Sequence, residues 1–178
     1  MRRKQSTRVE EDLDSLFRKA DALMGRGRLQ EAFRLFLRGA QAGEPSCQLN
    51  VGCLYDVGKG VRRSRERALY WYRKGARRRE GPAANNIATL YRDDGRPRLA
   101  ARWFEKAVAW GDYDALLELA KLYLGPLKDR SRARRALIRI QRHREQTSVH
   151  SQEEAAALLA RAGGAISGRR GKGMSAPE

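Results

Sequence analysis

The chain has 178 residues, of which 33% are charged, and this length fits one domain of ordinary size. Its mean hydropathy is −0.73, and no apolar run reaches the roughly 18 residues that a membrane-spanning helix needs. The formal net charge of +17 favours acidic partners, which are nucleic acid, an acidic protein or an anionic surface. A composition biased by a GC-rich genome would explain the same charge, so the charge alone does not identify a partner.

The N-terminal segment, residues 1–9, is basic and is followed by no apolar stretch, which argues against a secretory signal. The chain has two cysteines, Cys47 and Cys53, which are six residues apart in one predicted helix and would point in different directions. This spacing suits neither a disulfide nor a zinc pair, and we expect small apolar packing residues in a reduced compartment. We therefore predict a cytoplasmic location.

Helical periodicity begins with a predicted helix over residues 10–25, and three later segments align with one another: residues 47–55, 83–91 and 115–123. Each of the three has small or apolar residues at i, i+4, i+7 and i+8, which form one face of a helix. A small residue in each would let a neighbouring helix approach closely. These small residues are Gly52, Ala88 and Ala120. We name these four predicted helices the A helices.

A second helix accompanies each A helix and has apolar residues at i, i+3, i+4 and i+8. Its first apolar position moves from Ala32 to Ala68 and then to Ala100, which are offsets of 36 and 32 residues. We name these the B helices, and a fourth, poorer one is predicted over residues 130–145. The alternation predicts about four helix-turn-helix repeats. Aromatic residues on the B-helix stripe are expected in the core: Trp71, Tyr72, Trp103 and Phe104.

The C-terminal part is predicted to close the stack of repeats. Ser151 and Glu154 have the spacing of a capping box, and the helix over residues 151–162 has a mostly small apolar face. From residue 163 the chain is rich in Gly, Ser and Arg, which is typical of disorder. The predicted organisation is a basic segment (1–9), a helical repeat domain (10–162) and a disordered tail (163–178).

The best-defined repeat resembles the Sel-like repeat, a relative of the tetratricopeptide repeat. Gly-x-x-Tyr begins at Gly52, Gly-x-Gly-Val occupies residues 58–61, and Ala-x-x-Trp-Tyr occupies residues 68–72, in the order of that family. The resemblance covers roughly residues 28–145. The Gly-x-Gly-Val loop occurs only once, and the later units have shorter connections, as in tetratricopeptide repeats.

The resemblance implies an all-α fold, namely a right-handed α-solenoid of about four repeats with a C-terminal capping helix. Its concave face would be lined mostly by A helices. It also implies an adaptor or scaffold that gathers partner proteins. The handedness, the concave face and the adaptor role come from the family and not from the periodicity. Separately from the resemblance, we expect no enzymatic activity and no cofactor.

Polar A-helix positions outside the apolar stripe are the first candidate partner-binding surface. Asn is a poor helix former, so its recurrence at one repeat position, Asn50 and Asn86, suggests a role beyond helix propensity. Ordinary solvated side chains and hydrogen bonds between repeats are the alternatives. The predicted set is Arg18, Gln48, Asn50, Asn85, Asn86 and Glu118.

Arginine clusters on the B helices and their flanks are the second candidate surface, predicted on the convex side. They would track phosphates, with an ordinary solvated face as the alternative. We expect no exposed aromatic residue among them, although stacking on single-stranded nucleic acid would need one. The predicted patch is Arg62, Arg63, Arg77, Arg78, Arg79, Arg132, Arg134 and Arg135.

Catalysis requires convergent titratable groups, and the sequence offers few. Neither His143 nor His150 lies near a nucleophile or a carboxylate cluster at helical spacing, and no metal-ligand spacing occurs. We therefore predict a protein-binding adaptor that takes an acidic or extended peptide on its concave face. The alternative is a nucleic-acid-associated protein that uses the Arg-rich convex surface and both tails. The sequence does not indicate an oligomeric state.

Overall fold

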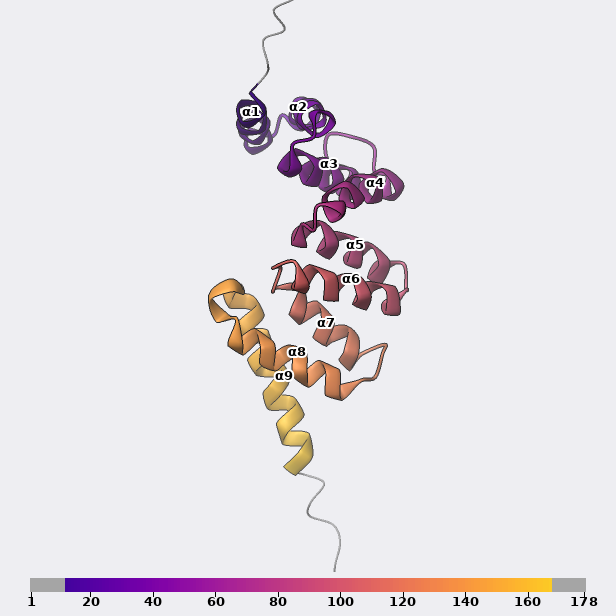
Figure 1. Ribbon diagram of the computed structural model, residues 1–178, viewed down its shortest axis with the longest axis vertical. Helices are drawn as coiled ribbons and strands as arrows, with labels where there is room; N and C mark the ends of the chain where they lie inside the picture. Colours follow the sequence, from indigo (N-terminus) through magenta and orange to yellow (C-terminus); the bar gives the residue numbers. More distant parts are fainter. Residues whose placement is uncertain (1–11, 168–178) are drawn as a thin grey trace, which may run out of the picture. The chain divides into compact units, whose positions relative to one another are not determined.

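The structure is a computed structural model that describes residues 12–167, with side chains to Arg161 (Figure 1). The chain divides into two compact units, residues 1–78 and 79–178. The first unit contains α1 (Leu13–Gly25), α2 (Leu29–Ala42), α3 (Pro45–Val57) and α4 (Arg65–Arg77). The second contains α5 (Gly81–Asp93), α6 (Pro97–Ala109), α7 (Ala115–Leu124), α8 (Arg130–Arg142), a 3-10 turn at Arg144–Gln146, and α9 (Val149–Ser167). No strand occurs in residues 12–167, which confirms the all-α prediction.

Within each unit, consecutive helices pack side by side in chain order (Figure 1). The predicted A helices are α1, α3, α5 and α7, and the predicted B helices are α2, α4, α6 and α8. Helix α9 packs on α8 and also contacts α7, which is the place of a capping helix. The helix-pair repeats and the C-terminal cap are therefore confirmed.

Side chains placed just before α1, α3, α4 and α8 accept hydrogen bonds from free N–H groups of the first turn. The Glu44 carboxylate accepts hydrogen bonds from the backbone N–H groups of Ser46, at 3.0 Å, and Cys47 at the start of α3. Partial burial raises the pKa of Glu44, but these hydrogen bonds outweigh it and lower the pKa below its usual value. Ser64 and Asp129 cap α4 and α8 in the same way.

Each unit has its own apolar core. In the first, Phe36 and Val51 are fully buried with Tyr72, and Trp71 is 7% exposed. The second unit has a continuous cluster from α5 to α9, in which the largest fully buried side chains are Phe104, Leu116, Leu137 and Ile140. Trp103 is partly buried against this cluster, so the prediction that the B-helix aromatics belong to the core is confirmed.

Both cysteines are free thiols in the first unit. Cys47 is completely buried where α3 passes Gly39 of α2. Burial, together with the adjacent Glu44 carboxylate, raises the pKa of the Cys47 thiol to about 12. The thiol is therefore protonated and unreactive at neutral pH.

The Gly-x-Gly-Val loop between α3 and α4 requires its glycines. Gly58 and Gly60 have φ values of 76° and 71°, in the left-handed region that L side chains rarely adopt. Gly60 also lies against the start of α2, where a Cβ atom would be 2.3 Å from the carbonyl oxygen of Leu29. Arg63, after the loop, is joined to the end of α3, since its Nε donates a hydrogen bond to the Asp56 carbonyl at 2.7 Å.

The capping box predicted at Ser151 and Glu154 is wrong. Ser151 lies inside α9 and is 4% exposed, and its backbone N–H donates instead to the hydroxyl of Ser148 at 3.3 Å. The Asp114 carboxylate, at the start of α7, accepts from the Ser148 N–H at 2.9 Å and from the Ser151 hydroxyl at 2.7 Å. A contact between distant segments therefore fixes the start of α9, and sequence spacing alone could not show it.

Helix α9 extends to Ser167 and not to residue 162 as predicted, so residues 163–167 of the predicted tail are helical. A glycine inside a helix costs only about 1 kcal/mol, so Gly163 and Gly164 do not by themselves end it. The remainder of the predicted tail, residues 168–178, lies outside the described residues. So do the predicted basic segment, residues 1–9, and the first two residues of the helix predicted from residue 10.

Candidate interaction surfaces

The predicted partner-binding residues of the first unit lie in different environments. The Arg18 side chain on α1 is 72% exposed, with a long 3.8 Å ion pair to Asp12. Asn50 on α3 is partly exposed, and its side-chain N–H donates to the Ser46 carbonyl at 2.8 Å. The Asn50 side chain therefore bonds its own helix but stays accessible.

Gln48 does not lie on a partner-facing surface. It is 4% exposed, and its side-chain N–H donates to the Ala40 carbonyl at 3.1 Å. Its position on α3 faces α2, so Gln48 joins two helices of the first unit. Its inclusion among the surface residues is therefore corrected.

In the second unit, the predicted residues lie on α5 and α7. Asn85 donates its side-chain N–H to the Asp112 carboxylate at 2.9 Å, which joins α5 to the loop before α7. Asn86 is partly exposed on α5. Glu118 on α7 accepts hydrogen bonds from Arg92 on α5 and from Lys121, the latter at 3.2 Å. Bonding between repeats, the alternative reading of these positions, accounts for Asn85 and for much of Glu118.

Glu118 belongs to a row of charged side chains across α5, α7 and α9. We name Arg92, Glu118, Lys121 and Glu154 the A-face charge row. Arg92 pairs with Glu118, Glu118 with Lys121, and Lys121 with Glu154 at 2.9 Å. Their side chains are 27–38% exposed. Partial burial lowers the pKa of Lys121, but its hydrogen bonds to Glu154 and Glu118 outweigh this and raise it.

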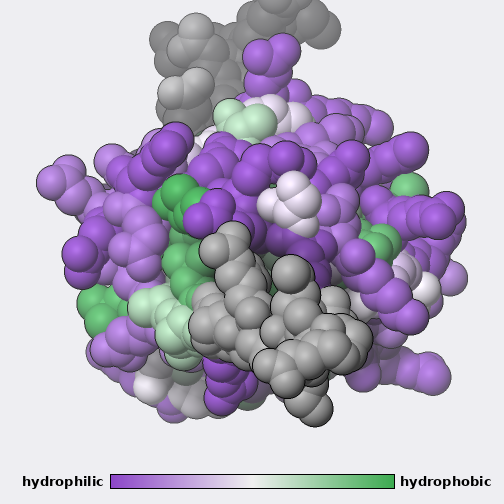
Figure 2. Space-filling view, turned by 90° about the horizontal axis from the view of Figure 1, so that it is seen from below, coloured by the Kyte–Doolittle hydropathy of each residue, from purple (hydrophilic) through white to green (hydrophobic). Residues whose placement is uncertain are grey.

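Several residues of the predicted basic patch make structural contacts. Arg78 donates to the Gly43 carbonyl at 2.7 Å, and Arg135 to the Ser131 hydroxyl at 3.4 Å. Arg62, Arg77, Arg79 and Arg134 are exposed. Arg62, Arg63, Arg77 and Arg78 belong to the first unit, and Arg79, Arg132, Arg134 and Arg135 to the second. Figure 2 shows one face of the molecule, on which hydrophilic residues predominate and hydrophobic ones form small patches.

A tyrosine–arginine pair recurs at the end of three A helices and explains part of the arginine content. The Arg67 guanidinium lies 5.4 Å from the centre of the Tyr55 ring, and Arg96 lies 5.3 Å from that of Tyr91. Arg132 lies 5.6 Å from the centre of the Tyr123 ring. Each arginine comes from the beginning of the following B helix or its cap. Cation–π contacts of this kind hold α3, α5 and α7 each to the B helix that follows.

One surface feature contradicts the expectation that the arginine clusters lack an exposed aromatic residue. Tyr70 on α4 is 55% exposed. The Lys74 ammonium lies 5.1 Å from the centre of the Tyr70 ring, and Arg73 and Arg77 follow on the same helix. Periodicity assigned the neighbouring Trp71 and Tyr72 to the core, but Tyr70 lies one position outside that stripe.

The two histidines make ordinary contacts. His143 stacks on Tyr113 with ring centres 4.1 Å apart, and Nε2 of His150 lies 3.5 Å from Glu154. Among residues 12–167, no three His, Cys, Asp or Glu side chains are arranged to hold a metal ion. No helix in this part of the chain is long and apolar enough to cross a membrane.

The sequence matches an established repeat family over the helix pairs described above. The Sel1 repeat model matches residues 27–44, 45–79 and 82–112. These three stretches of the chain are therefore similar to Sel1 repeats. The second Sel1 match covers α3 and α4, and the third covers α5 and α6. Helices α7 and α8 continue the same pairing beyond the matched residues.

A curated relative is the chitin synthase regulator SKT5 of Saccharomyces cerevisiae, which is 37% identical over 76 residues. The match covers 43% of this chain but only 11% of the regulator, so the likeness is confined to a short part of a much longer protein. Sel1 repeats generally serve as protein-interaction scaffolds.

Two solved Sel1-type structures share the fold. A Sel1 repeat protein from Oxalobacter formigenes has a TM-score of 0.67 and 24% identity, and the match covers 79% of this chain and 61% of that one. The antigen c5321 of uropathogenic Escherichia coli, which displays an SLR fold, has a TM-score of 0.70 and 18% identity. That match covers 85% of this chain and 34% of the antigen. At these identities the likeness establishes the helical-repeat fold alone.

Proposed function

We propose that this protein is a non-enzymatic, cytoplasmic interaction scaffold that binds partner proteins through the A-helix surface of its Sel1 repeats. The observation that carries the proposal is the A-face charge row on α5, α7 and α9. Its side chains are partly exposed and alternate in sign, with two basic and two acidic members. A surface of mixed sign suits another protein, whereas phosphate binding requires a surface of predominantly positive charge.

A partner can also break the ion pairs of the row at a small cost in free energy. Ion pairs with this degree of exposure contribute only about 0–1 kcal/mol each, because water screens them and ordering long side chains costs entropy. A partner can therefore replace one internal pair by an intermolecular one at small cost. Asn86, which is partly exposed on α5 of the same unit, would add a hydrogen bond at the edge of this interface.

The test is affinity capture of partner proteins from nuclease-treated lysate of the organism that encodes the chain. We expect Glu118→Gln with Glu154→Gln to reduce captured protein about five- to tenfold, because two charges of the row disappear. The Asn50→Ala and Asn86→Ala pair should weaken capture less. Far-UV circular dichroism should show unchanged helix content in both variants.

The matched control is Glu145→Gln with Glu153→Gln. It removes the same charge from two exposed positions outside the row. It should capture the same proteins as the unaltered chain. Equal capture by the row variant and this control would refute the assignment of the partner site to the row.

A second candidate function, association with single-stranded nucleic acid, is favoured by Tyr70. An exposed aromatic ring beside Lys74, Arg73 and Arg77 on α4 is the combination of stacking platform and positive charge that single strands require. This candidate concerns α4 in the first unit and does not involve the A-face charge row.

We expect oligo-deoxythymidine to bind at low salt and to dissociate steeply as salt rises. Tyr70→Ala should weaken this binding about tenfold, since stacking on one ring contributes about 1–3 kcal/mol. Tyr70→Phe keeps the ring and should retain the affinity. Fluorescence anisotropy measures all three, and the absence of binding at low salt would eliminate the candidate.

A further inference from the structure

A furrow runs between the B helices α6 and α8 of the second unit, and residues of α7 also line it. It consists of two hollows of about 390 Å³ and about 250 Å³. The hollows share three lining residues, Glu105, Tyr123 and Arg132, so they form one continuous depression. None of the A-face charge row lines it, and it is therefore a different surface from that of the proposed function.

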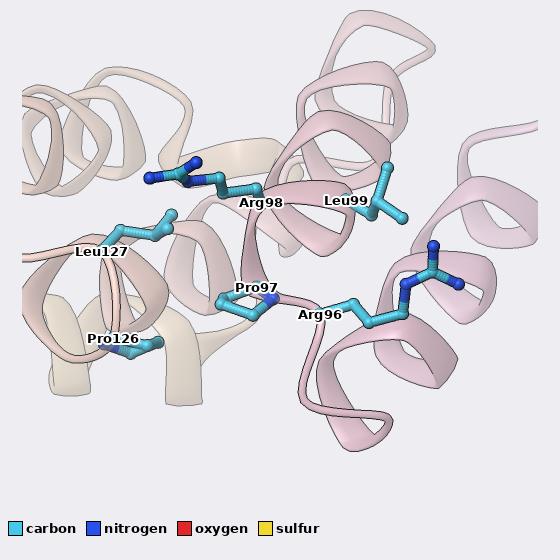
Figure 3. Close-up of a pocket in the computed structure, with 6 residues that line it drawn as sticks. All are labelled: Arg96, Pro97, Arg98, Leu99, Pro126 and Leu127. Atoms are coloured by element: carbon cyan, nitrogen blue, oxygen red, sulfur yellow. The ribbon is translucent and has the colours of Figure 1, made fainter.

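Arginine side chains form both walls of the furrow. Arg98 and Arg102 are four residues apart on α6, and Arg132, Arg135 and Arg139 occupy one face of α8. Arg98, Arg102 and Arg139 form no ion pair with any carboxylate in residues 12–167. Figure 3 shows a neighbouring hollow at the start of α6 that shares Arg98 and Leu127 with the furrow; Arg98 extends toward the side of Leu127, and Arg96 extends away from it.

Apolar residues form part of the floor of the furrow. They include Leu119 and Ala136, which are 5% and 4% exposed, with Leu127 at one end. Two acidic groups line the furrow. The Tyr123 hydroxyl donates a hydrogen bond to the Glu105 carboxylate at 2.7 Å, and the Asp129 carboxylate pairs with Arg132 at 3.3 Å. Tyr123 itself is only 4% exposed, so its ring is not available for stacking with a ligand.

We propose that this furrow binds an acidic amphipathic peptide segment of a partner protein. Carboxylates of the peptide would pair with the arginine walls, where the guanidinium fork matches a carboxylate in bidentate geometry. Apolar side chains of the peptide would cover the floor. A nucleic-acid backbone fits less well, because it has no apolar groups for the floor and finds no exposed ring on which its bases could stack.

The probe is a fluorescein-labelled peptide of repeated Glu-Glu-Leu triplets, and its companion has Gln in place of every Glu. Fluorescence anisotropy with the full chain should show binding of the acidic peptide and little binding of the companion. Arg98→Glu with Arg102→Glu should weaken binding about tenfold, because two attractive contacts become repulsive. Arg135→Glu with Arg139→Glu, on the opposite wall, should have the same effect, so the test survives if one variant folds poorly.

The matched control is Arg26→Glu with Arg34→Glu, two exposed arginines of the first unit. It changes the net charge equally and should leave the affinity within about twofold of the unaltered chain. If the control and the furrow variants lost affinity equally, net charge alone would explain the effect and the proposed site would be wrong. So would failure of the acidic peptide to bind, or equal binding of the Gln companion. Tighter binding of oligo-deoxythymidine that both wall variants abolish would assign the furrow to nucleic acid instead.

Discussion

Replacing Gly60 by alanine should lower the free energy of unfolding by about 2–5 kcal/mol. Two effects add at this position. The φ of 71° is unfavourable for a residue with a Cβ atom, and that Cβ would lie 2.3 Å from the Leu29 carbonyl oxygen and 2.5 Å from its carbon. Both neighbouring atoms are backbone at the start of α2, so relief of the clash requires the loop or the helix to move. Urea unfolding followed by circular dichroism measures the loss.

Gly27→Ala is the matched control for Gly60→Ala. Gly27 has a φ of 74°, but a Cβ there would meet nothing within 4 Å. It should therefore lose only the conformational part, about 1–2 kcal/mol. The difference between the two variants isolates the contact of the loop with α2. Equal losses would mean that this contact does not constrain the loop.

Replacing Gly52 by alanine should lower the free energy of unfolding by about 1–3 kcal/mol, although alanine favours helix. A Cβ on Gly52 would lie 2.5 Å and 2.6 Å from two carbons of the Tyr72 ring. This ring cannot easily move away, because it is 1% exposed and its hydroxyl lies 3.4 Å from the Cys53 sulfur. Burial, with the contact to Cys53, also raises the pKa of Tyr72, so the hydroxyl is protonated at neutral pH.

Gly25→Ala in α1 provides the comparison for Gly52→Ala. Gly25 is also helical, and a Cβ there would meet nothing within 4 Å. This variant should be neutral or more stable by at most about 1 kcal/mol, since only helix propensity changes. Opposite signs for the two variants would locate the close approach of α3 and α4 at Gly52. Unchanged stability of Gly52→Ala would contradict the packing described here.

The helices and their pairing could be predicted because they depend on local patterns. The small residues Gly52, Ala88 and Ala120 recur with apolar partners at helical spacing, and each lies on a buried face in the structure. Turn glycines such as Gly58 and Gly60 could be predicted for the same reason, since their backbone conformation is a local property. The buried aromatic stripe of α4 follows from periodicity alone.

The candidate sites were less predictable, because a polar residue at a regular spacing can face a partner, solvent or a neighbouring helix. The position of Gln48 in the repeat predicts that it faces a partner, yet in the structure it is buried against α2. Ser151 has capping-box spacing, but Asp114 and Ser148 organise the start of α9. Such outcomes depend on which distant side chain is adjacent after folding.

The sequence by itself determined the all-helical repeat architecture of this protein and its large positive charge, because periodicity and composition are local or additive properties. Only the tertiary structure decided how that charge is distributed. Packing of successive pairs places arginines over the tyrosine rings of the A helices. It also separates a mixed-sign row on α5, α7 and α9 from an arginine-walled furrow between α6 and α8. Residues from different helices meet on these surfaces only after the apolar faces beneath them are buried.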